Sequence, residues 1–346
     1  MCILRINIKE STMLILGIES SCDETGLALY SEDHGLIAHL VNSQIDLFTE
    51  YGGVIPEIAA RDHSAKIIGI LKQLLKQTNH KLNDIDLIAY TAGPGLIGSL
   101  MIGETVAKTI ANVLNIELLP INHLEGHILA PGLEEDGLEP PYLCLLVSGG
   151  HTQIIRCDGY GKYKIIGETI DDACGEAFDK VGKLLNLEYP GGPKVSQLAE
   201  NGDSQRFKFP RAMMKDKNLN FSFSGLKTSV LYALEDLNEE DHADVAASFQ
   251  EAVIDALTIK LMWAVQDTKI HKLVCSGGVA SNKLLRERLK QMAVNNNLEV
   301  SYPRMEFCTD NAAMIAYAGF IRKKFKLPTY STNYARPRWP LGELYD

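Results

Sequence analysis

Several features are missing from this 346-residue sequence, and each absence excludes a class of protein. No apolar run reaches the roughly 18 residues that a membrane-spanning helix needs, and the N-terminus has no apolar core long enough for a signal peptide. The seven cysteines form no C-x-x-C pair, which argues against a disulfide framework and against a cysteine-based zinc site. We therefore expect a cytoplasmic protein that has no membrane contact. Met13 directly precedes an apolar run, so residues 1–12 are expected to be an upstream start or a short extension.

Basic residues are in the minority. The sequence has 34 lysines and arginines against 44 aspartates and glutamates, and its net charge is −10, so nucleic acid could bind only through a local basic patch. Residues 206–217, which include Phe207 and Phe209 among the basic side chains, and residues 322–326 are such patches, and either could contact a phosphate backbone. The pattern G-x-x-x-x-G-K-[ST] is missing, which argues against a P-loop fold.

Four apolar segments each end in a turn rich in glycine or serine. Residues 14–19 and residues 142–147 both run into a polar turn and then into a second strand, and this repetition indicates a duplicated module. Residues 87–93 and residues 273–276 lead instead through glycine turns into helices. Backbone N–H groups at such turns can approach an anion without obstruction by Cβ atoms, so four turns together favour a phosphate-containing ligand.

The stretch PGLEEDGLEPP, rich in proline and acidic residues, is the plainest loop and predicts a boundary between two lobes. We expect a first lobe over residues 13–130, which the C-terminal segment 320–346 would complete, and a second lobe with inserted helices over residues 131–319. Apolar residues at helical spacing predict helices over residues 170–186 and 244–266.

His123 and His127 follow an apolar strand and lie four residues apart, so both imidazoles project from one face if the segment is helical. That geometry suits one divalent metal ion. A site of two histidines and one carboxylate favours iron(II) or zinc over magnesium. Asp310, at the start of a predicted helix, is the candidate carboxylate, and capping of that helix is its alternative role.

The histidine pair differs from the protease motif H-E-x-x-H, in which a glutamate directly follows the first histidine. Here Leu124 takes that position and Glu125 comes one residue later, about 100° further round a helix. Glu125 should therefore point away from the metal, and a zincin-type hydrolase is disfavoured.

Carboxylates supply further candidates for chemistry. Asp23 and Glu24 are adjacent in the first polar turn, where such a pair can accept a proton, hold a hydrated metal or orient a nucleophile, and where aspartate also occurs for conformational reasons alone. The helix predicted over residues 170–186 leaves Glu176, Asp179 and Lys183 on its polar face.

Ten short motifs occur together in a characteristic order. They are ESSCDET (19–25), AGPGLIGSL (92–100), HLEGH (123–127), LVSGGHT (146–152), GEAFDK (175–180), PGGP (190–193), FSFSGLKT (221–228), SGGVASN (276–282), CTDNAAMIAYAG (308–319) and ARPRWPL (335–341). With them the chain resembles the bacterial-type tRNA adenosine threonylcarbamoyltransferases, from about Met13 to its C-terminus.

The resemblance implies a two-lobed α/β protein with an actin-like fold, as in sugar kinases and heat-shock chaperone ATPases, built from duplicated ribonuclease-H-like modules. It implies transfer of the threonylcarbamoyl group from threonylcarbamoyl-AMP to the N6 amine of the adenosine next to the anticodon, in tRNAs that read codons beginning with A. Partners would be tRNA, a non-catalytic paralogue of the same fold and a small P-loop ATPase. A metal-dependent endopeptidase and an actin-fold kinase or ATPase remain alternatives.

By motif position, the resemblance also implies roles for individual residues. The metal ion, iron(II) or zinc, would be held by His123, His127 and Asp310, and turnover would need Asp23 and Glu24. The substrate would be bound by Leu146, Val147, Ser148, Gly149, Gly150, Asp179, Gly192 and Asn282. Two positions depart from the family pattern: Ser196 stands where many relatives have aspartate, which puts a ribose contact in doubt, and Ala312 stands where many have glycine.

Overall fold

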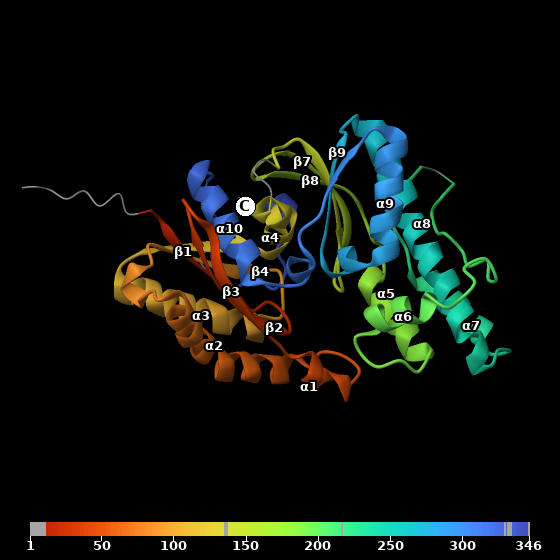
Figure 1. Cartoon of the computed structure of the whole chain (residues 1–346), viewed down its shortest axis with the longest axis horizontal. Helices are drawn as coiled ribbons and strands as arrows, with labels where there is room; N and C mark the ends of the chain where they lie inside the picture. The colour runs from red at the N-terminus through yellow and green to blue at the C-terminus, as the bar shows by residue number, and fades with distance from the viewer. Residues whose placement is uncertain (1–11, 135–137, 216, 329, 331–333, 345–346) are drawn as a thin grey trace, which may run out of the picture.

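A computed structural model describes residues 12–134, 138–215, 217–328, 330 and 334–344, and it shows two lobes side by side (Figure 1). Each lobe is built on one five-stranded mixed sheet. The predicted N-terminal extension lies almost wholly outside the described residues, as does part of the loop expected between the lobes.

The first sheet has the strand order β3-β2-β1-β4-β5. Its strands are β1 (Leu14–Glu19), β2 (Glu24–Ser31), β3 (Gly35–Ser43), β4 (Leu87–Gly93) and β5 (Glu117–Asn122). The hairpin pairings β1–β2 and β2–β3 are antiparallel, whereas β1–β4 and β4–β5 are parallel. The parallel pairs are joined through helices, as parallel strands require.

The second sheet repeats this topology with the order β8-β7-β6-β9-β10. Its strands are β6 (Tyr142–Val147), β7 (Thr152–Gly159), β8 (Lys162–Glu168), β9 (Lys272–Ser276) and β10 (Glu299–Ser301). Again the hairpin pairings are antiparallel, and β6–β9 and β9–β10 are parallel. The expected duplication is thus confirmed, because corresponding strands pair in the same order and the same sense.

Helices cover both sheets and connect them. The α-helices are α1 (Ile45–Thr49), α2 (Pro56–Thr78), α3 (Ile97–Leu114), α4 (His123–Leu129), α5 (Cys174–Leu184), α6 (Gly191–Ala199), α7 (Ser224–Leu234), α8 (His242–Thr268), α9 (Lys283–Asn296) and α10 (Ala312–Lys324). Short 3-10 turns are η1 (Leu82–Asp84), η2 (Ala130–Leu133), η3 (Glu239–Asp241), η4 (Gly278–Ser281), η5 (Met305–Phe307) and η6 (Leu341–Glu343).

The helix predicted over residues 170–186 begins later, at Cys174, because the side chain of Asp171 instead accepts hydrogen bonds from the start of α7.

The chain returns to the first lobe after it has completed the second. In Figure 1, α10 lies against the red and orange strands of the first sheet, and its buried face packs on β1, β2 and β4. The boundary expected at residue 319 falls inside this helix. We propose that the first lobe takes in all of α10 and the segment after it.

Alternate side chains of β6 face different cores, as the two-residue period of a strand dictates. Leu143, Leu145 and Val147 face α5 and α8. Tyr142, Cys144 and Leu146 share a second core with α4 and with the C-terminal segment. The short helix α4 therefore lies where the two lobes meet. Among the described residues, no helix combines the length and the apolar character needed to cross a membrane.

Candidate metal centre

The two histidines of the HLEGH motif lie on α4: His123 is its first residue, and His127 lies about one turn later. Asn122 caps this helix, since its side-chain oxygen accepts hydrogen bonds from the backbone N–H groups of Leu124 and Glu125. The predicted helical geometry is confirmed, because the rings of His123 and His127 lie 4.7 Å apart, edge to face. Both side chains are almost wholly buried.

Asp310 joins the two histidines although it lies 183 residues further along the chain than His127. Its Oδ1 is 3.0 Å from Nε2 of His127 and 3.4 Å from Nε2 of His123, and one ligand atom from each of the three residues lies within 4.8 Å of the others. Capping of α10 falls to Asn311, whose side chain accepts from the backbone N–H of Met314 at 3.0 Å. The alternative role considered for Asp310 is therefore filled by its neighbour.

Because α10 packs closely on the first sheet, Asp310 lies next to the two histidines. A Cβ atom at Gly17 would lie 2.4 Å from the carbonyl oxygen of Ala312, and one at Gly26 would lie 2.9 Å from the Ala312 nitrogen. These glycines of β1 and β2 let the first turn of α10 rest directly on the sheet. Ala312, one of the two departures from the family pattern, is fully buried in this contact and serves packing.

A third carboxylate, Glu19 at the end of β1, fixes the ring of His123. Its Oε2 lies 3.1 Å from Nδ1 of His123 and also accepts from the hydroxyl of Thr91 at 2.5 Å, while its Oε1 accepts from the backbone N–H of Ser21. A carboxylate on the second ring nitrogen is the usual way to orient a metal-binding imidazole. Sequence reasoning missed Glu19, although the residue opens the ESSCDET motif.

The charges of this cluster act strongly on one another. Burial alone would lower the pKa of His123, but the carboxylates of Asp310 and Glu19 outweigh it and hold that pKa well above its usual value. Burial alone would raise the pKa of Asp310, but His123 and His127 hold it well below its usual value.

The donor set fits a divalent metal ion. Ligand atoms about 2.1 Å from one ion would be about 3.0–3.4 Å from one another, which is the spacing between Asp310 and each imidazole. Two imidazoles and one carboxylate are typical ligands of iron(II) and zinc. Nδ1 of His127 is buried and has no hydrogen-bond partner within the described part of the chain. This ring therefore contacts the cluster through its other nitrogen, Nε2, which lies beside Oδ1 of Asp310.

Asp23 ends the turn between β1 and β2, and Glu24 is the first residue of β2; both lie next to the cluster. Glu24 is buried and Asp23 is half-buried. Burial raises the pKa of Glu24 well above its usual value, and the carboxylates of Asp23 and Asp310 raise it further. The acidic pair and the proposed metal ligands therefore share one electrostatic environment.

The turn from Ser148 to His151 approaches the same cluster from the second lobe. Gly149 and Gly150 are exposed, and a Cβ atom on either would meet no other atom within 4 Å. His151 was not singled out from the sequence, yet burial and then the charges of His123 and His127 lower its pKa to about 4. The side chains of Leu146 and Val147 are fully buried, so these two residues could contact a substrate only through their backbone.

The remaining predicted substrate residues form two groups. Asp179 on α5 accepts from the backbone N–H groups of Gly191 and Gly192, at 2.8 Å and 3.3 Å, and so caps α6. Asn282, the N-cap of α9, donates from Nδ2 to Ser196 at 2.9 Å and to Gln250 at 2.7 Å. Ser196 thus lies directly beside a residue predicted to bind nucleotide.

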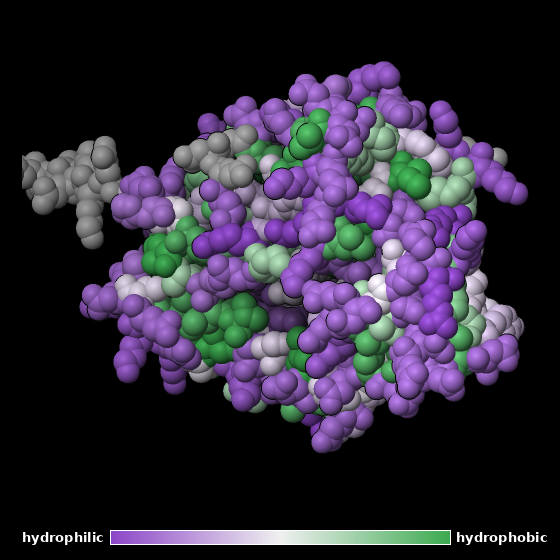
Figure 2. All heavy atoms as spheres, turned by 45° about the vertical axis from the view of Figure 1, so that its right-hand side comes forward, coloured by the Kyte–Doolittle hydropathy of each residue, from purple (hydrophilic) through white to green (hydrophobic). Residues whose placement is uncertain are grey.

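Tyr189, which comes just before the PGGP motif, lies where the second lobe faces Asp23 in the first lobe. Burial raises the pKa of this phenol, and the charges of Asp23 and Asp179 raise it further, so both carboxylates lie near it. The backbone oxygen of Tyr189 also accepts from the Thr49 hydroxyl, at 3.4 Å, across the lobes. On the face shown in Figure 2, the molecular surface is hollowed between the two lobes.

The two basic patches are less positive than the sequence indicated. In the first, Arg206 pairs with Asp241 and Asp244, and Arg211 pairs with Asp255. In the second, Arg322 is buried against Glu125, and Lys323 pairs with Glu117. Acidic residues from distant parts of the sequence therefore neutralise these four basic side chains. The four do not form an unpaired basic strip.

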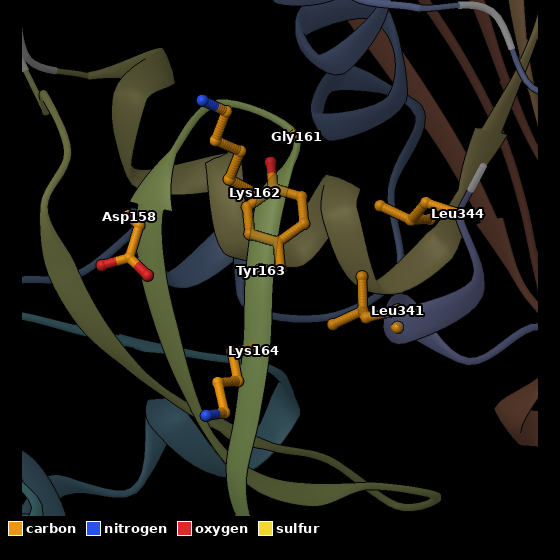
Figure 3. A pocket seen from close by; sticks show the side chains of 8 residues that line it. Asp158, Gly161, Lys162, Tyr163, Lys164, Leu341 and Leu344 are labelled. Carbon is orange, nitrogen blue, oxygen red and sulfur yellow. The ribbon is translucent and has the colours of Figure 1, made fainter.

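A surface pocket lies away from the cluster, between β8 and the C-terminal η6. Figure 3 shows Tyr163 at its centre, with Leu341 and Leu344 facing it from the C-terminal segment. Lys162, Lys164 and Asp158 lie at its edges.

Comparisons with known proteins agree with these observations. A family model described as tRNA N6-adenosine threonylcarbamoyltransferase (TsaD) matches residues 35–317. A full-length HypF in a phosphate- and nucleotide-bound form is 13% identical with a TM-score of 0.62, over 91% of this chain and 47% of that one. HypF from T. kodakarensis is 16% identical with a TM-score of 0.62, over 96% and 49%. Component A of the Acidaminococcus fermentans (R)-2-hydroxyglutaryl-CoA dehydratase is 13% identical with a TM-score of 0.52, over 88% and 96%.

The similar structures support the fold alone at these identities, and this chain spans about half the length of the HypF proteins. The actin-like α/β fold with two duplicated lobes is nevertheless the one expected from the sequence, and it is confirmed.

Proposed function

Because the chain belongs to the family of tRNA N6-adenosine threonylcarbamoyltransferases, we propose that its cleft transfers a threonylcarbamoyl group from threonylcarbamoyl-AMP to tRNA. The acceptor would be the N6 amine of the adenosine next to the anticodon, in tRNAs that read codons beginning with A, and AMP would be released. The observation that carries this proposal is the meeting of His123, His127 and Asp310 with the acidic turn of the first lobe.

A divalent ion, for which we propose iron(II), would supply Lewis-acid and template chemistry when held by His123, His127 and Asp310. The exposed backbone of Gly149 and Gly150 can approach a phosphate closely, and its N–H groups would stabilise negative charge on the departing AMP. Asp179, Gly192 and Asn282 would hold the nucleoside part.

The acyl donor is a mixed anhydride and already activated, so the protein need not supply a covalent nucleophile. The N6 amine attacks the carbamoyl carbon, the new C–N bond forms, and the bond to the phosphate oxygen of AMP breaks. The amine loses one proton in this step, and we propose that the carboxylate of Asp23 or Glu24 accepts it.

The endopeptidase alternative lacks its general base. In the protease motif the glutamate acts beside the metal, whereas Glu125 here is fully buried on the other side of α4 in an ion pair with Arg322. The kinase alternative would transfer phosphate and would have no need of paired histidines.

A partner of the same fold would dock on α2 and α3. Ile68 of α2 and Ile97 and Met101 of α3 are each about half exposed, at 45%, 47% and 53%. Figure 2 shows hydrophobic side chains gathered on the first lobe. Exposed apolar side chains gathered on one face are typical of protein interfaces. We propose this face for the paralogue, and we propose that the small P-loop ATPase acts on the resulting complex.

Mass spectrometry of tRNA nucleosides tests the function directly. The full chain is incubated with tRNA, synthetic threonylcarbamoyl-AMP and the candidate partners, and digested nucleosides are analysed. The expected product is adenosine heavier by one threonylcarbamoyl group, with one AMP released for each. A phosphorylated product, or a cut peptide formed without tRNA, would instead support one of the alternatives.

A further inference from the structure

Glu125 is the centre of a buried network on the side of α4 that faces away from the metal ligands. Its carboxylate accepts from Nη1 of Arg322 at 3.0 Å and 3.1 Å and from the hydroxyl of Tyr163 at 3.1 Å. It also accepts from the hydroxyl of Tyr330. These partners come from α10, from β8 and from the chain after α10, so one side chain ties α4 to three separate segments.

A second attachment holds the start of α4. While the side-chain oxygen of Asn122 caps the helix, its Nδ2 donates to the backbone oxygen of Trp339 at 2.9 Å. Trp339 is fully buried and packs edge to face on Tyr330, with ring centres 4.5 Å apart. The C-terminal segment therefore contacts α4 at its cap through Trp339 and at its middle through Tyr330.

Such anchoring matters because α4 has only seven residues, and a helix this short has little stability of its own. His123 and His127 meet Asp310 only if α4 and α10 keep one relative position. Arg322 lies on α10, about 15 Å along the helix from the end that carries Asp310. The Glu125–Arg322 pair thus fixes the same two helices that the metal ligands join, at a second point.

Tyr163 connects this network to the surface. Its hydroxyl reaches Glu125, while its ring lies in the surface pocket opposite Leu341 and Leu344 (Figure 3). The C-terminal segment thus covers Tyr163 as well as the start of α4.

We propose that Glu125 is a positioning residue: with Arg322, Tyr330 and Asn122, it ties α4 to α10 and to the C-terminal segment and so sets the affinity of His123, His127 and Asp310 for metal. This role rests on the metal site of the proposed function, but it does not depend on the reaction. Glu125 touches no ligand atom of the cluster, and it acts only through the position of the helix.

Metal titration of the full chain tests the role without tRNA. Co²⁺ is added to metal-free wild type and to Glu125→Gln, Tyr330→Phe and Tyr163→Phe, and its visible absorption gives both a Kd and a spectrum of the ligand geometry. We expect Glu125→Gln to raise the Kd by about 10- to 100-fold, the usual effect of losing a residue that orients metal ligands, and to alter the spectrum. The two phenylalanine variants, which each remove a single hydroxyl, should shift the Kd less and in the same direction.

Lys260→Met is the matched control. Lys260 is also buried and donates to the backbone oxygens of Met213 and Asn218, but it lies in the second lobe and contacts no part of α4. We expect this variant to lower the unfolding midpoint of the metal-free protein and to keep the wild-type Kd and spectrum.

The outcomes separate the two proposals. If wild type binds Co²⁺ and the tyrosine and glutamate variants bind it with the same Kd and spectrum, the positioning role is overturned and the metal site stands. The role is overturned equally if Lys260→Met weakens Co²⁺ binding as much as Glu125→Gln. Should Glu125→Gln fail to fold, Tyr330→Phe and Tyr163→Phe decide. A wild-type chain that binds no Co²⁺ would overturn both proposals.

Discussion

Oε2 of Glu19 lies 3.1 Å from Nδ1 of His123, and the opposite ring nitrogen of this histidine faces Asp310. The strand β1 thus orients a side chain of α4 that we propose as a metal ligand. Because Glu19 is fully buried and also accepts from Thr91 and Ser21, its carboxylate has a fixed position. The ring of His123 is held before any ion binds, which lowers the cost of forming the site.

We therefore expect Glu19→Gln to weaken metal binding by about 10- to 100-fold, since the amide accepts less strongly from the imidazole and no longer fixes its tautomer. Metal content after dialysis, measured by inductively coupled plasma mass spectrometry, checks this. Glu32→Gln, on the exposed turn after β2, serves as the control and should retain wild-type metal content. Equal metal content in both variants would assign Glu19 to folding alone.

Asp23→Ala should abolish tRNA modification and leave the metal content intact. Asp23 is half-buried beside Glu24 and contributes to the charge felt by that carboxylate, but it is not one of the three clustered ligands. Nucleoside mass spectrometry and metal analysis on the same preparation separate the two effects. Loss of metal together with activity would reassign Asp23 to the structure of the site.

Ser196→Asp should bind AMP about tenfold more tightly than wild type. The serine hydroxyl lies beside Asn282, and a carboxylate there could accept charge-assisted hydrogen bonds from ribose hydroxyls. Calorimetric titration with AMP measures the change. Ser196→Ala is the control, and AMP binding by the aspartate variant no tighter than by the alanine variant would contradict the expected ribose contact.

Asp171 should make stability depend on acid pH. Burial alone would raise the pKa of Asp171, but hydrogen bonds from the Ser222 and Ser224 hydroxyls and from two backbone N–H groups at the start of α7 lower it overall. A folded-state pKa below the unfolded value near 3.9 contributes stability above that value, and the contribution is lost as the pH falls through the folded pKa.

Asp171→Asn should accordingly lower the free energy of unfolding by about 0.3–1 kcal/mol at pH 7, because the neutral amide keeps an acceptor oxygen but loses the negative charge that favours a helix N-terminus. The difference from wild type should shrink as the pH falls below 4. Urea unfolding at pH 7, pH 4 and pH 3 measures it. An unchanged difference across these conditions would show that the side chain acts through its shape and not through its charge.

Met101→Glu should weaken binding of the proposed paralogue. A charge at this half-exposed position would have to be desolvated in an apolar interface. Val113→Glu is the control, since Val113 is 77% exposed near the other end of α3. Light scattering of mixtures with the purified paralogue measures the complex. Equal affinity for both variants would place the partner elsewhere.

Local patterns predicted the helices and strands well, and the chemistry of the side chains predicted that His123, His127 and Asp310 would lie together. Strand hairpins, glycine turns and the helical spacing of His123 and His127 depend on neighbouring residues, so the sequence alone reveals them. Asp310 could be selected because few carboxylates stand at a helix start after an apolar stretch. Glu125 comes one residue later than the glutamate of the protease motif, and from this we predicted that it points away from the histidines. The prediction is confirmed, because the side chain lies on the far side of α4 and pairs with Arg322.

Contacts between distant residues could not be predicted in this way. Arg322 belongs to a run of basic residues that is typical of an exposed surface, yet it is buried because Glu125, 197 residues earlier, supplies its counter-charge. Glu19 ends an apolar strand and continues into a polar turn, so nothing local distinguishes it from a solvated residue. Its burial depends on Thr91 and His123, which other elements bring to it.

The return of α10 to the first lobe has a consequence for biosynthesis. All five strands of that lobe precede residue 123, but the helix that covers β1, β2 and β4 is translated only after the entire second lobe. Until α10 is translated, one apolar face of the first sheet stays exposed to water, and the two histidines lack the carboxylate of Asp310. A chain that ends before residue 310 therefore lacks both α10 and the third residue that we propose as a metal ligand.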